Sequence, residues 1–228
     1  MNTKALNRNN MRRSFFVLLV ILLAGEVSGA ATEKFSGPYI KGILGYGFGW
    51  IDIDVTANGD RDSERITLDG PEFGGVFGYG VVTPSRFYAG FEVEASYSFA
   101  DGTGSTDSGG VRIDYDFEKD YTIGLYVLPG YLVTENLLIF GRFGWAQTRF
   151  DLAMDASGPG GSARVTDSDT EDSFRLGLGA DYWVRDNFFF RAEYLWADYG
   201  SYSERRDDLR VKVASQDHLL RVGFGGRF

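Results

Sequence analysis

Eight stretches of this sequence alternate between apolar and polar side chains, one residue at a time. In the last of them, DHLLRVGFGGRF (217–228), Leu220 and Phe224 share one face while Arg221 and Arg227 share the other. Such a period of two residues is typical of a β-strand, whose successive side chains point to opposite faces. The same alternation predicts seven further strands, over residues 38–53, 71–82, 86–100, 121–133, 136–147, 172–184 and 187–200.

The face opposite the apolar one is built mainly from glycine and charged residues. A soluble β-sandwich would have the apolar face inside, and a core of glycine and arginine would pack poorly. A barrel with lipid outside and a narrow polar lumen explains both faces together. The predicted fold is therefore all-β, an eight-stranded antiparallel up-and-down transmembrane β-barrel in which glycine leaves room for long inward Arg and Glu side chains.

The segments between the predicted strands fall into two kinds. Three are short turns, at residues 83–86, 134–136 and 185–187, and four are long and polar, at about 57–70, 101–118, 153–172 and 203–213. Short turns at one end and long extracellular loops at the other are the arrangement of bacterial outer-membrane barrels. Aromatic residues near the strand ends suit the two interfacial girdles of such a barrel; they are Tyr39, Trp50, Phe87, Phe99, Tyr131, Phe188, Tyr202 and Phe228.

The first thirty residues have the pattern of a secretory signal peptide. Arg12 and Arg13 precede the apolar run SFFVLLVILLAG, and small residues follow up to Ala30. We expect residues 1–30 to be removed, with cleavage after Ala31 and a true start at Met11 as alternatives, and residues 31–228 to form the barrel. The remainder holds 19 Lys and Arg against 31 Asp and Glu, a formal charge of −12, which argues against nucleic-acid binding.

Two segments resemble a known family. FSGPYIKGILGYGFG (35–49) is similar to the opening strand, and LLRVGFGGRF (219–228) to the closing strand, of the small porin-like surface-antigen family of Gram-negative outer membranes. The resemblance implies an eight-stranded barrel related to the transmembrane domain of OmpA. It also implies that Phe228, supported by Phe224, is the signal read by the barrel-assembly machinery. Gly226 departs from the pattern, since the family usually has an aromatic residue there.

The sequence predicts no catalytic, metal-binding or cofactor-binding site. His218 is the single histidine, and Ser215 and Asp217 lie beside it in sequence, but a catalytic triad is assembled by geometry rather than by adjacency. The acidic run TDSDTEDS (166–173) lacks the glycine and the distal glutamate of an EF-hand. The absence of cysteine excludes disulfides and Cys-ligated metals.

The inward charges are the main predicted functional site. Unpaired charge in a confined lumen is costly, so we expect these acidic and basic side chains to pair with each other. The predicted network consists of Glu92, Glu94, Arg142, Arg175, Arg191, Glu193 and Arg221.

Three functions are compatible with this network. The first is a structural and surface-interaction barrel with acidic outer loops and a largely plugged lumen. The alternatives are a narrow diffusion pore and, more remotely, an enzyme that modifies lipid A in the outer leaflet. The expected location is the outer membrane of a Gram-negative cell. The expected partners are outer-membrane lipids, lipopolysaccharide, periplasmic chaperones and the assembly machinery, and the sequence leaves the oligomeric state open.

Overall fold

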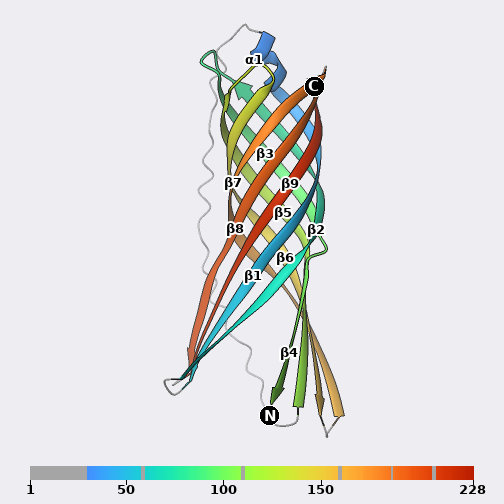
Figure 1. The fold of residues 1–228 in the computed structure, drawn as a ribbon, viewed down its shortest axis with the longest axis vertical. Helices are drawn as coiled ribbons and strands as arrows, with labels where there is room; N and C mark the ends of the chain where they lie inside the picture. Colours follow the sequence, from blue (N-terminus) through green and yellow to red (C-terminus); the bar gives the residue numbers. More distant parts are fainter. Residues whose placement is uncertain (1–29, 58–59, 109–110, 159–160, 186, 207–208) are drawn as a thin grey trace.

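The chain forms a closed antiparallel β-barrel whose strands wind steeply around its axis (Figure 1). The computed structural model describes residues 30–57, 60–108, 111–158, 161–185, 187–206 and 209–228. The predicted signal peptide, apart from its last residue, lies outside the described residues. In the described part, no helix is long and apolar enough to cross a membrane.

The barrel has eight strand positions around its circumference, and one of these positions is occupied by two consecutive strands. The strands are β1 (Gly37–Ala57), β2 (Asp60–Val82), β3 (Phe87–Ser98), β4 (Asp101–Ser108), β5 (Val111–Leu132), β6 (Leu137–Gly158), β7 (Gly161–Arg185), β8 (Phe188–Arg206) and β9 (Leu209–Arg227). β3 and β4 continue each other along β5, with a break of two residues between them. Closure comes from pairing of β9 with β1, for example Tyr39 with Arg227. The prediction of an eight-stranded antiparallel barrel is confirmed.

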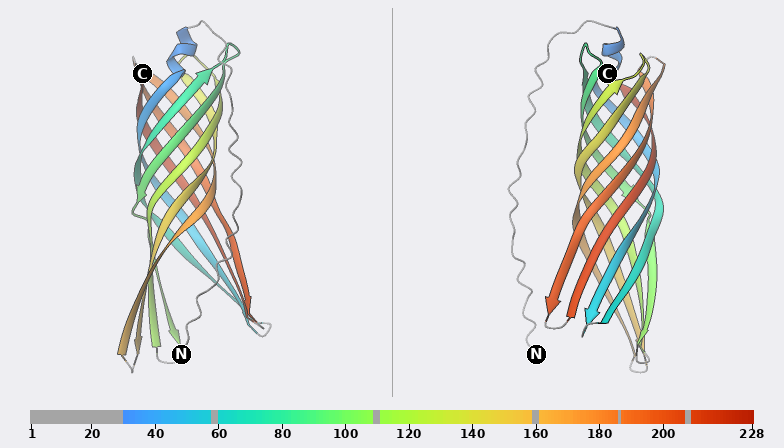
Figure 2. Two further views of the ribbon diagram at one scale, coloured as in Figure 1. Left: turned by 180° about the vertical axis from the view of Figure 1, so that it is seen from behind. Right: turned by 60° about the vertical axis from the view of Figure 1, so that its left-hand side comes forward.

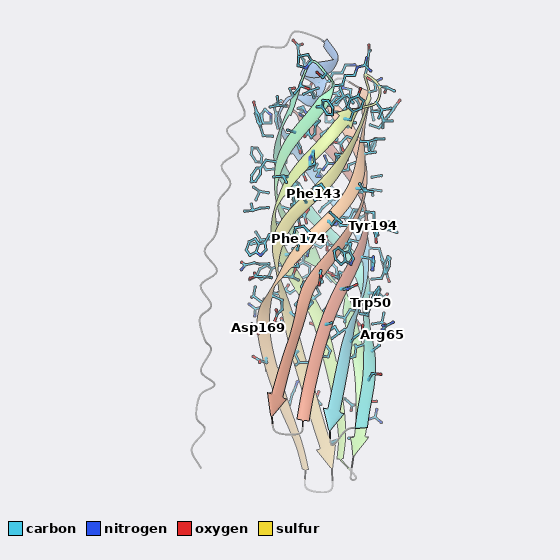
Figure 3. All side chains as sticks on the ribbon, turned by 90° about the vertical axis from the view of Figure 1, so that its left-hand side faces the viewer. Trp50, Arg65, Phe143, Asp169, Phe174 and Tyr194 are labelled. Carbon is cyan, nitrogen blue, oxygen red and sulfur yellow. The ribbon has the colours of Figure 1, made fainter. Side chains whose placement is uncertain are left out.

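The two faces of each strand have the predicted environments. Apolar side chains cover the outside of the barrel, and Leu178, Phe87 and Val222 are 68%, 61% and 59% exposed. Phe143, Phe174 and Tyr194 can be followed on this outer surface in Figure 3. Charged side chains on the opposite face are buried inside the barrel. A water-soluble protein rarely exposes so large a continuous apolar surface, so this surface is suited to lipid.

The four segments predicted as long polar loops are instead mostly β-strand. β-strand pairing continues through most of these polar segments, and β6 and β7 remain in register as far as Gly158 and Gly161. Backbone hydrogen bonds between antiparallel strands do not require apolar side chains, so a polar hairpin can extend the barrel wall beyond the apolar band. The alternation of polarity ends where the apolar band ends, and for that reason it did not reveal the extensions.

These extensions separate into two groups at the hairpin end of the barrel. β8, β9, β1 and β2 lean to one side, while β4, β5, β6 and β7 lean to the other (Figure 2). β7 and β8 stop pairing beyond Phe174 and Asp198, and β2 pairs with β4 only through Asp69 and Asp101. Near the hairpin tips, the barrel wall therefore lacks strand pairing at two places, between β7 and β8 and between β2 and β4.

The opposite end is capped by the segment before β1. It carries the three short turns, at the predicted positions, and a single described helix, α1 (Ala30–Phe35). Phe35 is buried and packs against Trp183, with 5.4 Å between ring centroids. Arg227 donates hydrogen bonds to the carbonyl oxygens of Phe35 and Gly37. The segment before β1 is thus tied to the last strand across this end.

One predicted girdle residue is misassigned. Tyr39 is completely buried and points into the lumen, because it has the same phase as Lys41 on β1. Trp50 is partly exposed, and the side chain of Tyr202 lies outside the described residues. The other five residues are exposed on the outer surface, as predicted; they are Phe87, Phe99, Tyr131, Phe188 and Phe228.

Candidate functional site

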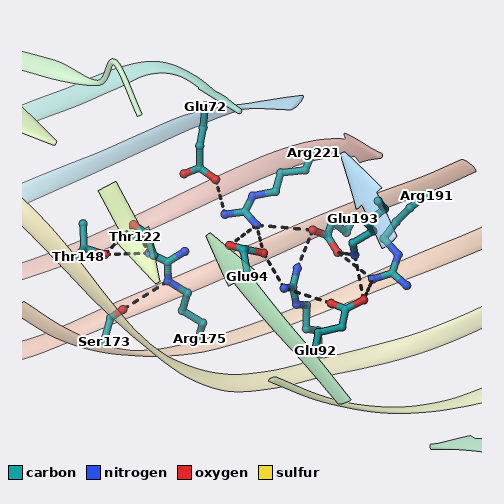
Figure 4. A network of polar contacts seen from close by, with 12 residues as sticks. Glu72, Glu92, Glu94, Thr122, Thr148, Ser173, Arg175, Arg191, Glu193 and Arg221 are labelled. Atoms are coloured by element: carbon teal, nitrogen blue, oxygen red, sulfur yellow. Dashed lines mark hydrogen bonds and ion pairs between the residues drawn. The ribbon is translucent and has the colours of Figure 1, made fainter. Parts of the chain in front are cut away.

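Arg142, on β6, is buried in the charged lumen and contacts three carboxylates. Figure 4 shows these carboxylates, Glu92, Glu94 and Glu193, within the network. The Nη2 atom of Arg142 is 2.6 Å from Glu94 Oε2 and 3.2 Å from Glu92 Oε2, and its Nη1 atom is 2.8 Å from Glu193 Oε1. The three carboxylates come from β3 and β8, which lie on different sides of the barrel. One planar guanidinium therefore bridges the lumen, which the fork geometry of arginine allows and a lysine ammonium does not.

Toward the capped end, Glu92 collects several donors. Its Oε1 atom is 2.6 Å from Arg191 Nη1 and 3.0 Å from Lys41 Nζ, and it accepts a hydrogen bond of 2.7 Å from the Tyr39 hydroxyl. Arg191 also binds Asp181 with two parallel contacts, of 2.5 and 2.7 Å. Asp181 and Arg191 are direct cross-strand partners on β7 and β8, so this pair follows from the sheet register.

Toward the hairpin end, Arg221 links Glu94 to one further carboxylate, Glu72. Its Nη1 atom is 2.9 Å from both oxygens of Glu94, and its Nη2 atom is 2.5 Å from Glu72 Oε1. Beyond it, Lys119 Nζ is 2.5 Å from Asp217 Oδ2, which also accepts a hydrogen bond from the Tyr199 hydroxyl. The ion pairs thus form successive layers along the barrel axis.

Arg175 differs from its predicted role. It is fully buried, but it forms no ion pair with the carboxylates of the described residues. Its Nη2 atom instead contacts the hydroxyls of Thr148 and Thr122 at 3.0 and 3.4 Å, and its Nε atom contacts the Ser173 hydroxyl at 3.4 Å. The inward phase of Arg175 places it among the buried residues but does not determine which polar partners lie at the same height.

Aromatic rings and glycines complete the packing of the lumen. The guanidinium of Arg142 lies 3.8 Å from the centre of the Tyr126 ring, and a cation so placed is attracted by the ring face. A side chain added at Gly144 would collide with Tyr126, and one at Gly78 would collide with Tyr39. Several lumen glycines therefore make room for inward tyrosine rings rather than for the charged side chains alone.

Besides Asp217, which was considered only for catalysis, four members of the network were missed in the sequence. Lys41, Glu72 and Asp181 have the inward phase on their strands, so the pattern that revealed Glu92 could have revealed them. Lys119 could not be found in this way. The register of β5 against β6 shifts between Lys119 and Thr122, and such a bulge reverses which alternate residues face inward.

The residues considered for catalysis are not brought together. Ser215 and Asp217 lie on the inner phase of β9, and Asp217 is held by Lys119. His218 has the outer phase, with its ring stacked on Phe48 at 5.3 Å between centroids and its Nδ1 atom 2.5 Å from the Tyr194 hydroxyl. Among the described residues, no group of acidic or histidine side chains is placed to hold a metal ion.

The two phenylalanines of the predicted assembly signal lie on the outer surface of β9 and just beyond it. Phe224 stacks on Phe188 with ring centroids 5.4 Å apart, and Phe228 is 77% exposed. The backbone N–H of Phe228 donates to the carbonyl oxygen of Pro38, so the chain is still bound to β1 at this position. Gly226 lies beside Phe188 on β8.

Comparison with known proteins gives a consistent assignment. The chain is 27% identical, over 209 residues, to the 31 kDa outer-membrane immunogenic proteins of Brucella melitensis biotype 1 and of Brucella suis biovar 1, which covers 86% of this chain and 85% of each relative. Two similar solved structures are the outer membrane protein OprG from Pseudomonas aeruginosa (14% identity, 85% of this chain and 98% of that one, TM-score 0.46) and a major outer membrane protein from Thermus thermophilus (14%, 81% and 99%, TM-score 0.41).

The family model described as "Outer membrane protein beta-barrel domain" matches residues 16–228, nearly the whole chain. The predicted location is therefore confirmed, as is the resemblance to outer-membrane surface antigens. The matched relatives are outer-membrane immunogenic proteins. The alternating faces, the closed barrel and the matched model together show that this chain belongs to the outer-membrane protein β-barrel domain family.

Proposed function

We propose that this protein is a structural and surface-interaction barrel of the outer membrane whose lumen is closed to solutes by its ion network. The observation that carries the proposal is Arg142, a fully buried guanidinium that bridges carboxylates from opposite walls. A solute crossing the lumen would have to separate these pairs. Breaking a buried pair costs several kcal/mol, on the order of 3–5, so spontaneous opening would be rare.

The composition of the lumen supports the same proposal. Among the residues that the structure describes, seven basic and six acidic side chains are buried, so most charges have an opposite charge nearby. They are Lys41, Lys119, Arg142, Arg175, Arg191, Arg221 and Arg227 with Glu72, Glu92, Glu94, Asp181, Glu193 and Asp217. A conducting lumen of an outer-membrane barrel is filled with water instead. The network thus has the composition of a packed interior rather than of a wet channel.

Conductance in planar lipid bilayers tests this proposal. The refolded protein is expected to give no steady single-channel current in molar KCl, while the Arg142→Ala variant, in the same bilayer system, gives one. Steady ohmic steps from the unchanged protein would favour the alternative, a narrow diffusion pore. The contacts of His218 with Phe48 and Tyr194 favour neither the closed barrel nor the diffusion pore. They also give no support to an enzyme that modifies lipid A.

We also infer the orientation and the processing of the chain. The short turns and α1 face the periplasm, the long hairpins face the outside, and their acidic side chains are exposed to partners beyond the cell.

Residues 1–30 are removed as a signal peptide. Periplasmic chaperones accompany the chain, and the assembly machinery then reads Phe228 with Phe224. Lipopolysaccharide surrounds the outer rim. Intact mass measurement of the purified protein tests the cleavage site.

A further inference from the structure

A cleft of about 420 Å³ opens inside the hairpin end of the barrel, beyond the layer of Lys119 and Asp217. Its walls come from six strands, β1, β8 and β9 of one hairpin group and β5, β6 and β7 of the other. The residues that line it are Ile51, Phe117, Phe150, Leu152, Asp167, Asp169, Glu171, Tyr199, Gly200 and Ser215. They occupy the inward positions of their strands, so the cleft continues the lumen outward.

The polarity of this cleft is unusual for its position. Within the apolar band of the barrel, inward side chains are charged and outward ones apolar. In the hairpin extensions the inward positions of β1, β5 and β6 carry Ile51, Phe117 and Phe150, which are only half-buried. Neither lipid contact nor a closed core accounts for apolar side chains there. An apolar cleft of a few hundred Å³ is the common form of a small-molecule site.

The floor of the cleft is defined by rigid contacts. Tyr199 on β8 meets Phe150 on β6 in an edge-to-face contact, with ring centroids 5.4 Å apart, and its hydroxyl donates to Asp217. Gly200, at a φ of 79°, forms the bulge in β8 beside Tyr199, in a conformation that residues with a side chain rarely adopt. The cleft is therefore bounded below by a fixed aromatic pair.

One wall of the cleft is strongly acidic. Asp167, Asp169 and Glu171 occupy successive inward positions of β7, and all three are exposed. Among the described residues that line the cleft there is no lysine or arginine. The lining of the cleft therefore presents a net negative charge to whatever enters it.

We propose that this cleft binds a small amphipathic organic cation, with an aromatic or aliphatic body against Phe117, Phe150 and Leu152 and an ammonium or guanidinium group against the carboxylates of β7. Burial of an apolar body gives affinity, and the acidic wall selects for positive charge. The proposal uses the outward orientation of the hairpins but not the closed lumen. A conducting barrel would bind the same cation.

Three indole compounds of similar size and different charge test the proposal. Tryptamine is a cation, tryptophol is neutral and indole-3-acetate is an anion. Isothermal titration of the protein in nanodiscs is expected to show binding in the order tryptamine, tryptophol, indole-3-acetate, with tryptamine at least about tenfold tighter than the anion. The preference is expected to shrink as salt rises, because exposed charges are screened.

Two variants separate the cleft from general surface charge. Asp169→Asn with Glu171→Gln is expected to reduce tryptamine binding to the level of tryptophol, while Asp172→Asn, on the outer phase of the same strand, leaves it unchanged. Ile51→Arg places a cation in the cleft and is expected to abolish tryptamine binding.

Equal affinity for the three compounds, or unchanged tryptamine binding in the double variant and in Ile51→Arg, would overturn the proposal. Resistance of each variant to SDS until heated verifies that it is folded. Bilayer conductance of the same samples reports separately on closure of the lumen, so a failure of the proposed function is distinguishable from a failure of this inference.

Discussion

Replacement of Arg142 by alanine tests the central bridge of the lumen. The change removes the contacts at 2.6, 2.8 and 3.2 Å to Glu94, Glu193 and Glu92. Glu92 keeps Arg191 and Glu94 keeps Arg221, but Glu193 retains only contacts between 3.6 and 4.0 Å. The loss is therefore concentrated on one carboxylate that stays buried without a close partner.

The expected destabilisation follows from that residual geometry. Removing one partner of a buried pair costs roughly 3–5 kcal/mol, and because two carboxylates keep close partners we expect the lower end, about 3 kcal/mol. Glu193→Gln in the same chain removes the stranded charge, so the double variant should recover roughly 1–3 kcal/mol of that loss. Arg142→Lys keeps the charge but cannot bridge both walls. Its stability should therefore lie between that of the unchanged protein and that of Arg142→Ala.

Urea titration of the barrel in lipid vesicles, followed by the heat-dependent shift on SDS gels, measures the stability. Planar-bilayer recording of the same variants measures conductance, which should rise in Arg142→Ala because the space left by the guanidinium admits water. If Arg142→Ala changes neither stability nor conductance, and a cysteine at position 142 reacts with a lipid-soluble thiol reagent, the inward network is refuted.

Three further predictions concern folding and assembly. The purified barrel should show β-type circular dichroism and resist SDS until heated, since closure leaves no free sheet edge within the apolar band; helical dichroism would contradict this. Deletion of Phe228 should lower the amount of folded protein in the outer membrane and leave export intact, as measured by cell fractionation; equal surface levels would remove its role as an assembly signal. Gly78→Val should destabilise the barrel by about 1–3 kcal/mol through collision with Tyr39, whereas Gly75→Val, on the outer face with open space around it, should not. Equal urea midpoints for these two variants would disprove that packing argument.

The sequence alone determined the strands of the apolar band, their inner and outer faces and the short turns. These features depend on one local rule, the alternation of side chains along a strand, which needs no knowledge of neighbouring strands. The residues of the predicted lumen network were found in the same way, because Glu92, Arg142 and Arg221 all have the phase opposite to the apolar one. Tyr39 does not belong to the outer girdle, because its phase on β1, and not its aromatic character near a strand end, decides which way it points.

Tertiary structure alone decided which inward residues meet. Ion pairing across the lumen depends on strand stagger and on the height of each side chain along the barrel axis, and alternation carries no information on either. Arg175 therefore meets Thr148 instead of a carboxylate, and the bulge after Lys119 brings that lysine to Asp217, 98 residues away. The hairpin extensions escaped detection for a related reason. They are held by backbone pairing in water, where neither face of a strand has to be apolar, so their polar side chains carry no periodic signal.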